Sequence, residues 1–194
     1  MHILRIGAEA EMKIYLIRHG KTTANEKHLY CGSTDLPLSE IGKEELKHIK
    51  YDIDVKNTVF VTSGMQRTQE TLKILFGDVE HSTDSRFKEI DFGIFEMKSY
   101  NELKDTAEYQ QWLNGDNYTN VAPKGESGAQ MEKRVLAALR DVAASDKDTV
   151  IITHGGVIAT IMANLFNNEN KNRYQWQPKC GHGYLIENDK YYIL

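Results

Sequence analysis

The stretch KIYLIRHG, Lys13–Gly20, decides how the rest of this 194-residue chain is interpreted. Its apolar run, Ile14–Ile17, ends abruptly in Arg18, His19 and Gly20. Four β-prone residues followed by charge and glycine predict a buried strand that feeds a loop. In an open α/β sheet, ligands bind in the crevice beyond the carboxyl ends of the strands. We therefore expect this strand to deliver an arginine and a histidine to a functional site.

Two other predicted strands end in the same way. Thr58–Thr62 is followed closely by Arg67, and Thr149–Thr153 runs directly into His154 and two glycines. If the three strands are neighbours in one sheet, two arginines and two histidines converge at its carboxyl edge. The planar guanidinium of arginine matches phosphate oxygens, and helix N-termini beyond the strands add backbone N–H donors. This pattern predicts a site for a phosphate group.

Strands and helices alternate along the chain, which predicts a three-layer α/β/α fold with a mainly parallel central sheet. Ser63 is interpreted as the start of a capping box, and Ile41 and Ile49 as inward-facing helix residues. The last two strands, joined by a tight turn, are expected to add an antiparallel edge. The expected helices cover residues 39–50, 63–77, 99–113, 127–144 and 157–166, and the remaining strands 79–81, 184–187 and 191–194.

A single domain is expected over residues 1–194, because no repeat or low-complexity linker interrupts the chain. Residues 83–125 are irregular, charged and aromatic, and we expect them to form a cap-like insertion on that domain. Residues 1–11 fit poorly with the strand that begins after Met12, and they are interpreted as an extension. An extra edge strand over His2–Ile6 is the other interpretation.

The composition of the chain argues against several classes of binding partner. The net charge of −4 gives no reason to expect nucleic acid or an acidic membrane, and the longest apolar stretch, Val157–Leu165, is too short to span a bilayer. The basic and aromatic segment Lys171–Lys179 is accordingly expected to be a solvated loop. Cys31 and Cys180 are interpreted as free thiols without zinc, and with no secretion signal visible we expect a cytoplasmic protein. Whether the chain forms a homodimer is left open.

The chain resembles the histidine phosphatase superfamily, which includes the cofactor-dependent phosphoglycerate mutases and many small phosphatases. RHG alone is a weak signal, whereas six blocks in the family's order and at compatible spacings are a strong one. These blocks are RHGKTTAN (18–25), YCGSTDLPLSEIG (30–42), TSGMQRTQET (62–71), FKEIDFGIFE (87–96), PKGES (123–127) and ITHGGV (152–157).

The resemblance implies a role for each residue of the predicted site. His19 attacks the substrate phosphorus and becomes phosphohistidine, which water later hydrolyses. Arg18, Arg67 and His154 hold the equatorial oxygens of a loose, metaphosphate-like transition state. With this much fixed positive charge, neither a metal nor a cofactor is expected.

The same resemblance points to the general acid and to further phosphate contacts. Glu89 is the expected acid for the leaving alkoxide, with its pKa raised by a partly closed pocket. Glu126 is an alternative acid, or a carboxylate in the first turn of its helix. Asn25 is expected to be a secondary phosphate contact, and Thr22 is a weaker candidate.

Three positions depart from the family's usual residues: Lys21 replaces a frequent glutamate, Ser63-Gly64 two serines, and Met97 a frequent glycine. None of them removes a group that the mechanism needs. His182 lies between two glycines, where it is expected in a turn or at the mouth of the site.

The expected function is hydrolysis of a small organic phosphate, and α-ribazole 5′-phosphate is a candidate because the motifs look most like the α-ribazole and broad-specificity phosphatase branch. A phosphoglycerate mutase is the first alternative, although mutases of this superfamily are usually longer. A phosphohistidine-protein phosphatase is another, usually smaller. A non-catalytic phosphate-binding module is the alternative of a different class. The expected partner is a small-molecule phosphate ester.

Overall fold

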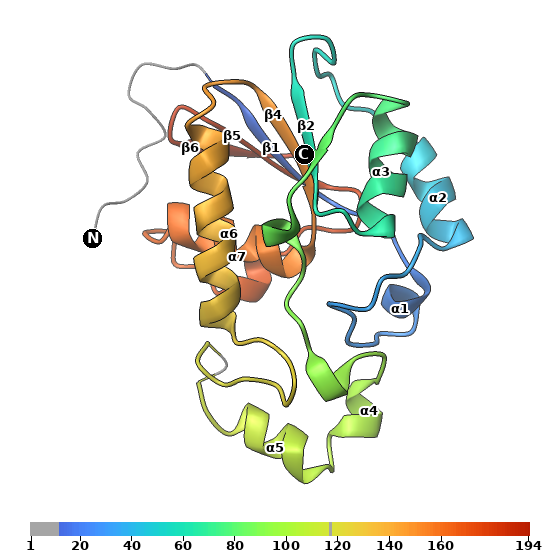
Figure 1. Ribbon diagram of the computed structural model, residues 1–194, viewed down its shortest axis with the longest axis vertical. Helices are drawn as coiled ribbons and strands as arrows, with labels where there is room; N and C mark the ends of the chain where they lie inside the picture. Colours follow the sequence, from blue (N-terminus) through green and yellow to red (C-terminus); the bar gives the residue numbers. More distant parts are fainter. Residues whose placement is uncertain (1–11, 117) are drawn as a thin grey trace.

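The computed structural model describes residues 12–116 and 118–194, and a six-stranded sheet runs through the middle of them (Figure 1). The strands are β1 (Ile14–Arg18), β2 (Val59–Thr62), β3 (Ser82–Thr83), β4 (Thr149–Thr153), β5 (Gly183–Glu187) and β6 (Lys190–Ile193). Their order is β3-β2-β4-β1-β5-β6. The pairs among β1 to β4 are parallel, whereas β5 pairs antiparallel with both β1 and β6. The predicted mainly parallel sheet with an antiparallel edge is confirmed.

The central pair, β1 and β4, joins segments that are far apart in the sequence. Arg18 lies opposite Thr153. Just before the strands, the Lys13 backbone N–H donates to Asp148 Oδ1 at 2.8 Å, across 135 residues. Both strands end at the same level, so the residues that come after them begin side by side.

Four longer helices cover the sheet: α2 (Glu40–Lys47), α3 (Gln66–Phe76), α6 (Gly128–Ala143) and α7 (Gly155–Leu165). The alternation of side chains along β1 supplies both faces. Ile14 and Leu16 pack into the core under α6 and α7, while Tyr15 and Ile17 pack on the opposite face with α3. Figure 1 shows α6 and α7 on one side of the sheet and α2 and α3 on the other. The three layers result from this alternation.

The segment between β3 and α6 contains short helical pieces: η1 (Ser85–Phe87), η2 (Gly93–Phe95), α4 (Tyr100–Leu103) and α5 (Ala107–Leu113). It has an apolar cluster of its own, separate from the clusters on the sheet, built on Phe95, Leu103, Tyr109 and Ala122. Figure 1 shows α4 and α5 beyond the carboxyl edge of the sheet. This segment therefore stands over the end of the sheet where the predicted site lies.

Several details of the elements differ from the prediction. Ile41 is 57% exposed, because α2 turns Leu46 rather than Ile41 toward the core. The strand expected at 79–81 forms at 82–83, where it pairs with the end of β2. The single helix expected over 99–113 is two helices, because Thr106 Oγ1 donates to the carbonyl oxygen of Leu103 and a new helix starts after Thr106.

Two polar segments carry more structure than expected. The segment 21–38 contains α1 (Thr23–Glu26). The segment 171–179 contains η3 (Arg173–Trp176), and Trp176 is 1% exposed because it packs against Phe166, Tyr184 and Tyr191. The prediction of a solvated loop there was wrong for this tryptophan. The expectations for residues 1–11 fall outside the described residues.

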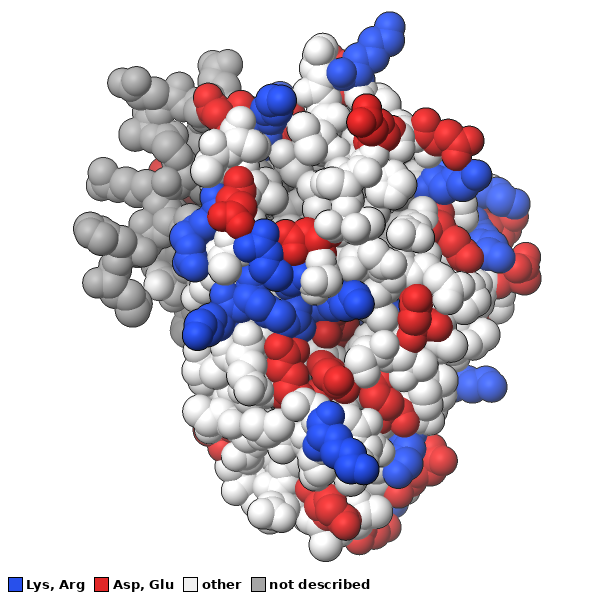
Figure 2. Space-filling model, in the orientation of Figure 1, with Lys and Arg blue, Asp and Glu red and all other residues white. Residues whose placement is uncertain are grey.

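Within the part of the chain that the structure describes, no helix has both the length and the apolar character needed to cross a membrane. Figure 2 shows basic and acidic side chains interspersed on one face, with a band of basic side chains bordered by acidic ones.

Candidate active site

His19 and His154 come directly after β1 and β4, and the pairing of these strands brings the two rings together. Their centroids are 5.1 Å apart and the ring planes are inclined by 63°. The His19 backbone N–H donates to the carbonyl oxygen of Thr153 at 2.9 Å, which continues the ladder past the end of β1. Both side chains are buried. The predicted convergence at the carboxyl edge of the sheet is present.

The hydrogen bonds of His19 define its tautomer. Nδ1 lies 2.6 Å from the carbonyl oxygen of Gly20, which can only accept, so Nδ1 carries the proton and Nε2 keeps its lone pair. Burial lowers the pKa of His19 well below its usual value, and the charges of Arg67 and Arg18 lower it further. The ring is therefore neutral at neutral pH, as a nucleophile must be.

His154 is oriented through both ring nitrogens. Arg67 Nε donates to Nδ1 at 3.3 Å, and since Nδ1 accepts, Nε2–H donates to Ser63 Oγ at 2.8 Å. Burial, followed by the Arg67 charge, lowers the pKa of His154 well below its usual value. Ser63 therefore does not cap α3, whose N-cap is Met65 without a side-chain bond. Ser63 instead orients His154 in the site, a role that its sequence pattern did not indicate.

Arg67 lies in the first turn of α3 and is 1% exposed. Besides Nε, its Nη1 and Nη2 donate to the carbonyl oxygens of Thr34 and Gly32 at 2.9 and 2.8 Å. Three of the five guanidinium N–H groups are thus used for positioning, which leaves two for a ligand. An arginine in this position would be costly without an anionic partner, because the N-terminus of a helix favours negative charge.

The loop that holds Arg67 is itself held by Glu96. This carboxylate accepts backbone N–H bonds from Gly32, Ser33 and Thr34, and a further one from Phe92, all at 3.0–3.2 Å. The Thr34 hydroxyl donates to it at 2.6 Å. Glu96 belongs to the segment between β3 and α6, which we call the cap segment. Its carboxylate therefore ties the cap segment to the loop Gly32–Thr34, which in turn holds Arg67.

Arg18 has a buried donor that no described residue satisfies. Nη1 donates to the Pro178 carbonyl oxygen at 2.8 Å, whereas the buried Nε has no acceptor in residues 12–116 and 118–194. A Cβ at Gly155 would come within 3.2 Å of that Nε, so the guanidinium lies across the start of α7. A buried N–H without an acceptor costs about 1–3 kcal/mol, and an anionic oxygen would satisfy it.

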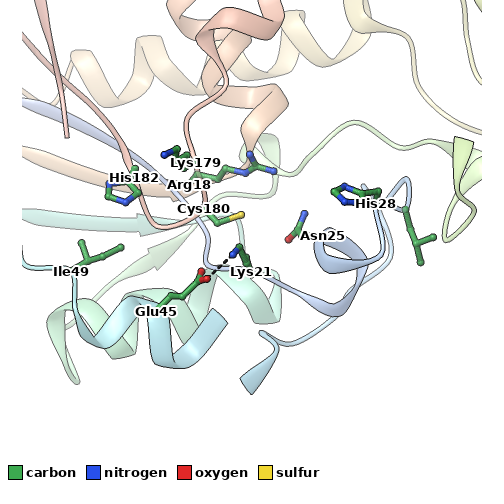
Figure 3. Close-up of a pocket in the computed structure, with 10 residues that line it drawn as sticks. Arg18, Lys21, Asn25, His28, Glu45, Ile49, Lys179, Cys180 and His182 are labelled. Carbon is green, nitrogen blue, oxygen red and sulfur yellow. Dashed lines mark hydrogen bonds and ion pairs between the residues drawn. The ribbon is translucent and has the colours of Figure 1, made fainter. Parts of the chain in front are cut away.

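Asn25 and Thr22 act together. The Asn25 Oδ1 accepts from the backbone N–H and the hydroxyl of Thr22, both at 3.0 Å, so these two contacts use the amide oxygen and not the amide N–H groups. Figure 3 shows Asn25 facing the same space as Arg18. Thr22 is the N-cap of α1 and is buried. It therefore positions Asn25 and has its hydroxyl engaged there.

Glu89 lies at the N-terminus of α7. Its Oε2 accepts from the Gly156 backbone N–H at 2.8 Å and its Oε1 from the Ile90 backbone N–H at 3.0 Å. Arg134 holds this segment by donating to the carbonyl oxygens of Lys88 and Glu89 at 2.7 and 3.1 Å. The carboxylate is thus placed beside the residues that come after His154.

Glu126 has a different environment. Both of its carboxylate oxygens accept from Arg134, at 2.7 Å each. It also precedes Ser127, the N-cap of α6, so it is not in the first turn of that helix, which was one of its two expected positions. The Glu126 carboxylate is therefore ion-paired with Arg134, the same residue that holds the segment around Glu89.

Within residues 12–116 and 118–194, no three His, Cys, Asp or Glu side chains are grouped like metal ligands. Cys31 and Cys180 are free, and burial raises the pKa of both thiols. Thiols with raised pKa values are poor nucleophiles at neutral pH.

Two buried histidines with two arginines beside them suit a phosphate group, and the comparison with known proteins identifies the family of this chain. The family model of the histidine phosphatase superfamily (branch 1) matches residues 14–190, so this chain belongs to that superfamily. Membership supports a phosphatase or mutase type of enzyme.

The three relatives described next each share less than 30% sequence identity with this chain. A probable phosphoglycerate mutase, GpmB, of Yersinia enterocolitica is 29% identical over 164 residues, which are 79% of this chain and 74% of that protein. The α-ribazole phosphatase of Shigella flexneri superposes with a TM-score of 0.80 at 24% identity, over 94% of this chain and 95% of that one. A phosphoglycerate mutase of Thermus thermophilus gives 0.73 at 23% identity, over 94% and 96%. The two structural matches establish a shared fold.

Proposed function

We propose that this protein hydrolyses a small phosphomonoester through a phosphohistidine intermediate at His19. The observation that carries the proposal is the state of His19, a buried, neutral ring whose Nε2 lone pair is free while Nδ1–H is bound to Gly20. Two arginines next to it provide the positive charge that a phosphoryl group requires.

In the first step, His19 Nε2 attacks phosphorus and the ester P–O bond breaks. Glu89 is proposed as the acid that gives the leaving oxygen its proton. In the second step, Glu89 takes a proton from water, whose oxygen attacks the phosphohistidine. The P–N bond breaks, inorganic phosphate leaves, and both residues return to their starting states.

The surrounding groups stabilise the transferred phosphoryl oxygens. Arg18 Nε, the two uncommitted Arg67 N–H groups and the Asn25 amide are the available donors. The N-terminus of α7 adds a favourable dipole at the same place. His154 is proposed to act mainly by holding Arg67 through Nδ1, because both of its ring nitrogens already have partners.

For the substrate, α-ribazole 5′-phosphate is the first candidate. It is supported by the end-to-end structural match with the α-ribazole phosphatase of Shigella flexneri, over 94% of this chain and 95% of that one. The second candidate is a phosphoglycerate mutase activity, which the sequence match with GpmB favours. That match covers 74% of GpmB, so we place the mutase second.

The proposal is tested by phosphate release from a panel of esters in the presence of a chelator. The panel contains α-ribazole 5′-phosphate, 3-phosphoglycerate, sugar phosphates and p-nitrophenyl phosphate. We expect release by the wild-type protein and a loss of at least about 1000-fold in His19→Ala, since the nucleophile is gone.

The alternatives give other results. Isomerisation of 3-phosphoglycerate after priming with bisphosphoglycerate, without net release, would identify a mutase. Folded protein with neither activity would contradict the proposal and leave a phosphate-binding module.

A further inference from the structure

Helix α3 contributes more to the site than Arg67. Two buried threonines, Thr68 and Thr71, follow Arg67 on the inner face of this helix. Thr68 Oγ1 lies 3.2 Å from the Oγ of Ser63, which contacts His154. The inner face of α3 therefore reaches one histidine of the site through Thr68 and Ser63. Thr71 reaches the other histidine.

The Thr71 hydroxyl has two backbone partners. Its Oγ1 lies 2.6 Å from the carbonyl oxygen of Arg67, which can only accept, so the hydroxyl proton is used there. The same Oγ1 accepts the backbone N–H of Gly20 at 2.9 Å. A bond from threonine to the carbonyl four residues earlier is common in helices. The bond to Gly20 leaves the helix and spans 51 residues, so this hydroxyl connects α3 to the loop after β1.

Gly20 is held by hydrogen bonds on both of its polar groups. Its N–H donates to Thr71, and its carbonyl oxygen accepts from His19 Nδ1 at 2.6 Å. The residue is buried, and a Cβ there would lie 2.7 Å from Leu46 Cδ1 and 3.2 Å from Leu38 Cδ2. In the part of the chain that the structure describes, Thr71 Oγ1 is the acceptor for this N–H. The position of Gly20 therefore depends on the Thr71 hydroxyl.

The position of the Gly20 carbonyl matters because it decides which nitrogen of His19 carries the proton. A neutral imidazole has one N–H, on either nitrogen, and the acceptor beside Nδ1 keeps it there. Glycine has the widest backbone freedom of all residues, so an unanchored Gly20 can turn this acceptor away. A ring protonated on Nε2 has no lone pair there to attack phosphorus.

On the basis of the proposed function, we propose that Thr71 is a positioning residue for the nucleophile. Its hydroxyl fixes Gly20, and Gly20 in turn keeps the proton of His19 on Nδ1, so that the lone pair of Nε2 is available. Thr71 acts through the backbone of Gly20 and not on the ester itself.

The direct test measures the tautomer of His19 in Thr71→Val, which keeps the shape of the side chain and removes the hydroxyl. NMR of the imidazole nitrogens reports which of them is protonated, and His19→Asn assigns the signals. We expect Nδ1 to carry the proton in the ligand-free wild-type protein. In Thr71→Val the form protonated on Nε2 should rise to at least about 10% of the molecules. Thr71→Ser, which keeps the hydroxyl, should restore the wild-type spectrum.

The kinetic test uses p-nitrophenyl phosphate, whose leaving group needs little help from an acid. In Thr71→Val the rate of phosphoryl transfer to His19, measured in the pre-steady state, should fall at least about tenfold. The half-saturating ester concentration should change less than about twofold, because Arg18 and Arg67 remain in place. Thr71→Ser should recover the rate.

Thr149→Val is the matched control. Thr149 is 1% exposed, and its hydroxyl donates to the carbonyl oxygen of Lys147 at 2.9 Å, at the amino end of β4. Its loss should change neither the His19 tautomer nor the rate. Thermal unfolding verifies that each variant is folded. If Thr71→Val does not fold, Thr71→Cys replaces it, because a thiol is a weak acceptor.

The outcomes separate this inference from the proposed function. An unchanged His19 tautomer in the folded Thr71 variant overturns the inference, and so does an equal change in Thr149→Val. A changed tautomer with an unaltered rate supports the role of Thr71 and contradicts Nε2 as the attacking atom. If the wild-type protein hydrolyses no ester, the phosphatase is contradicted, and the NMR comparison of ligand-free proteins still decides about Thr71.

Discussion

Single hydrogen bonds decide what each histidine of the site can do. The bond from His19 Nδ1 to Gly20 leaves Nε2 as the proposed nucleophile, while His154 has both nitrogens engaged with Arg67 and Ser63. The two imidazole rings have centroids only 5.1 Å apart, yet their hydrogen-bond partners differ. We therefore expect the two rings to have different roles.

The buried histidines also make stability depend on pH. The pKa of each is lowered in the folded protein, so below the unfolded value of about 6.5 the unfolded chain binds protons that the folded protein does not. The free energy of unfolding should be at its full value above this pH and fall below it, by up to about 1.4 kcal/mol per pH unit for each histidine.

Urea unfolding between about pH 7.5 and 5.5 measures this slope. His19→Asn, which removes one of the two rings, should have about half the slope. A free energy of unfolding that stays constant over this range would contradict the prediction.

At the scale of elements, the start of α7 holds Glu89, the proposed acid, through a backbone hydrogen bond. Glu89 accepts from the Gly156 N–H, and a Cβ at Gly156 would lie 2.4 Å from Glu89 Oε1. Glycine at this position leaves room for the Glu89 carboxylate, which occupies the space of a side chain.

We predict that Gly156→Ala separates stability from catalysis. The displaced carboxylate ends a flexible side chain and alanine favours helix, so the free energy of unfolding should change by less than about 1 kcal/mol. Turnover of glycerol 3-phosphate should fall by at least about tenfold, because its alkoxide needs a proton. The loss for p-nitrophenyl phosphate should be smaller. Glu89→Gln is the comparison, and equal losses for both esters in Gly156→Ala would count against the acid role.

The elements and contacts differed in how far they could be predicted. The three strands that carry the site have strong β-prone runs followed by charge, and each formed at its predicted place to within one residue. The contact of Ser63 with His154 could not be predicted, because the local pattern suits a helix cap, which the structure does not form, and His154 lies 91 residues away. Likewise, the carbonyl oxygen that accepts from Arg18 belongs to Pro178, 160 residues away. No local sequence pattern could predict this contact.

In the whole molecule, the cap segment and the phosphate site are connected by Glu96. It belongs to the cap segment, yet its carboxylate holds the backbone of Gly32–Thr34, whose carbonyl oxygens position Arg67. The cap segment therefore contributes to the site through a carboxylate that holds the loop behind Arg67.

Glu96→Ala should lower both stability and activity. The loop N–H groups lose a charged acceptor, which should cost about 3 kcal/mol of unfolding free energy, and kcat/KM should fall at least about tenfold as Arg67 loses its position. Denaturant unfolding and kinetics on one ester measure the two effects. Glu102→Ala, which removes a cap carboxylate bonded only to Ser99, is the control and should cost about 1 kcal/mol without loss of activity. Full activity in Glu96→Ala would show that Arg67 does not depend on this clamp.

The central pairing of β1 with β4 has a consequence for how the chain folds. The two strands meet only after a loop of well over a hundred residues closes, as the Lys13–Asp148 bond across 135 residues shows. Local helices and hairpins form much faster than such long-range pairs. Because His19 and His154 lie on opposite sides of that pairing, no partly folded intermediate that lacks it contains a working site. Catalytic competence is acquired with the slow, long-range step of folding and cannot precede it.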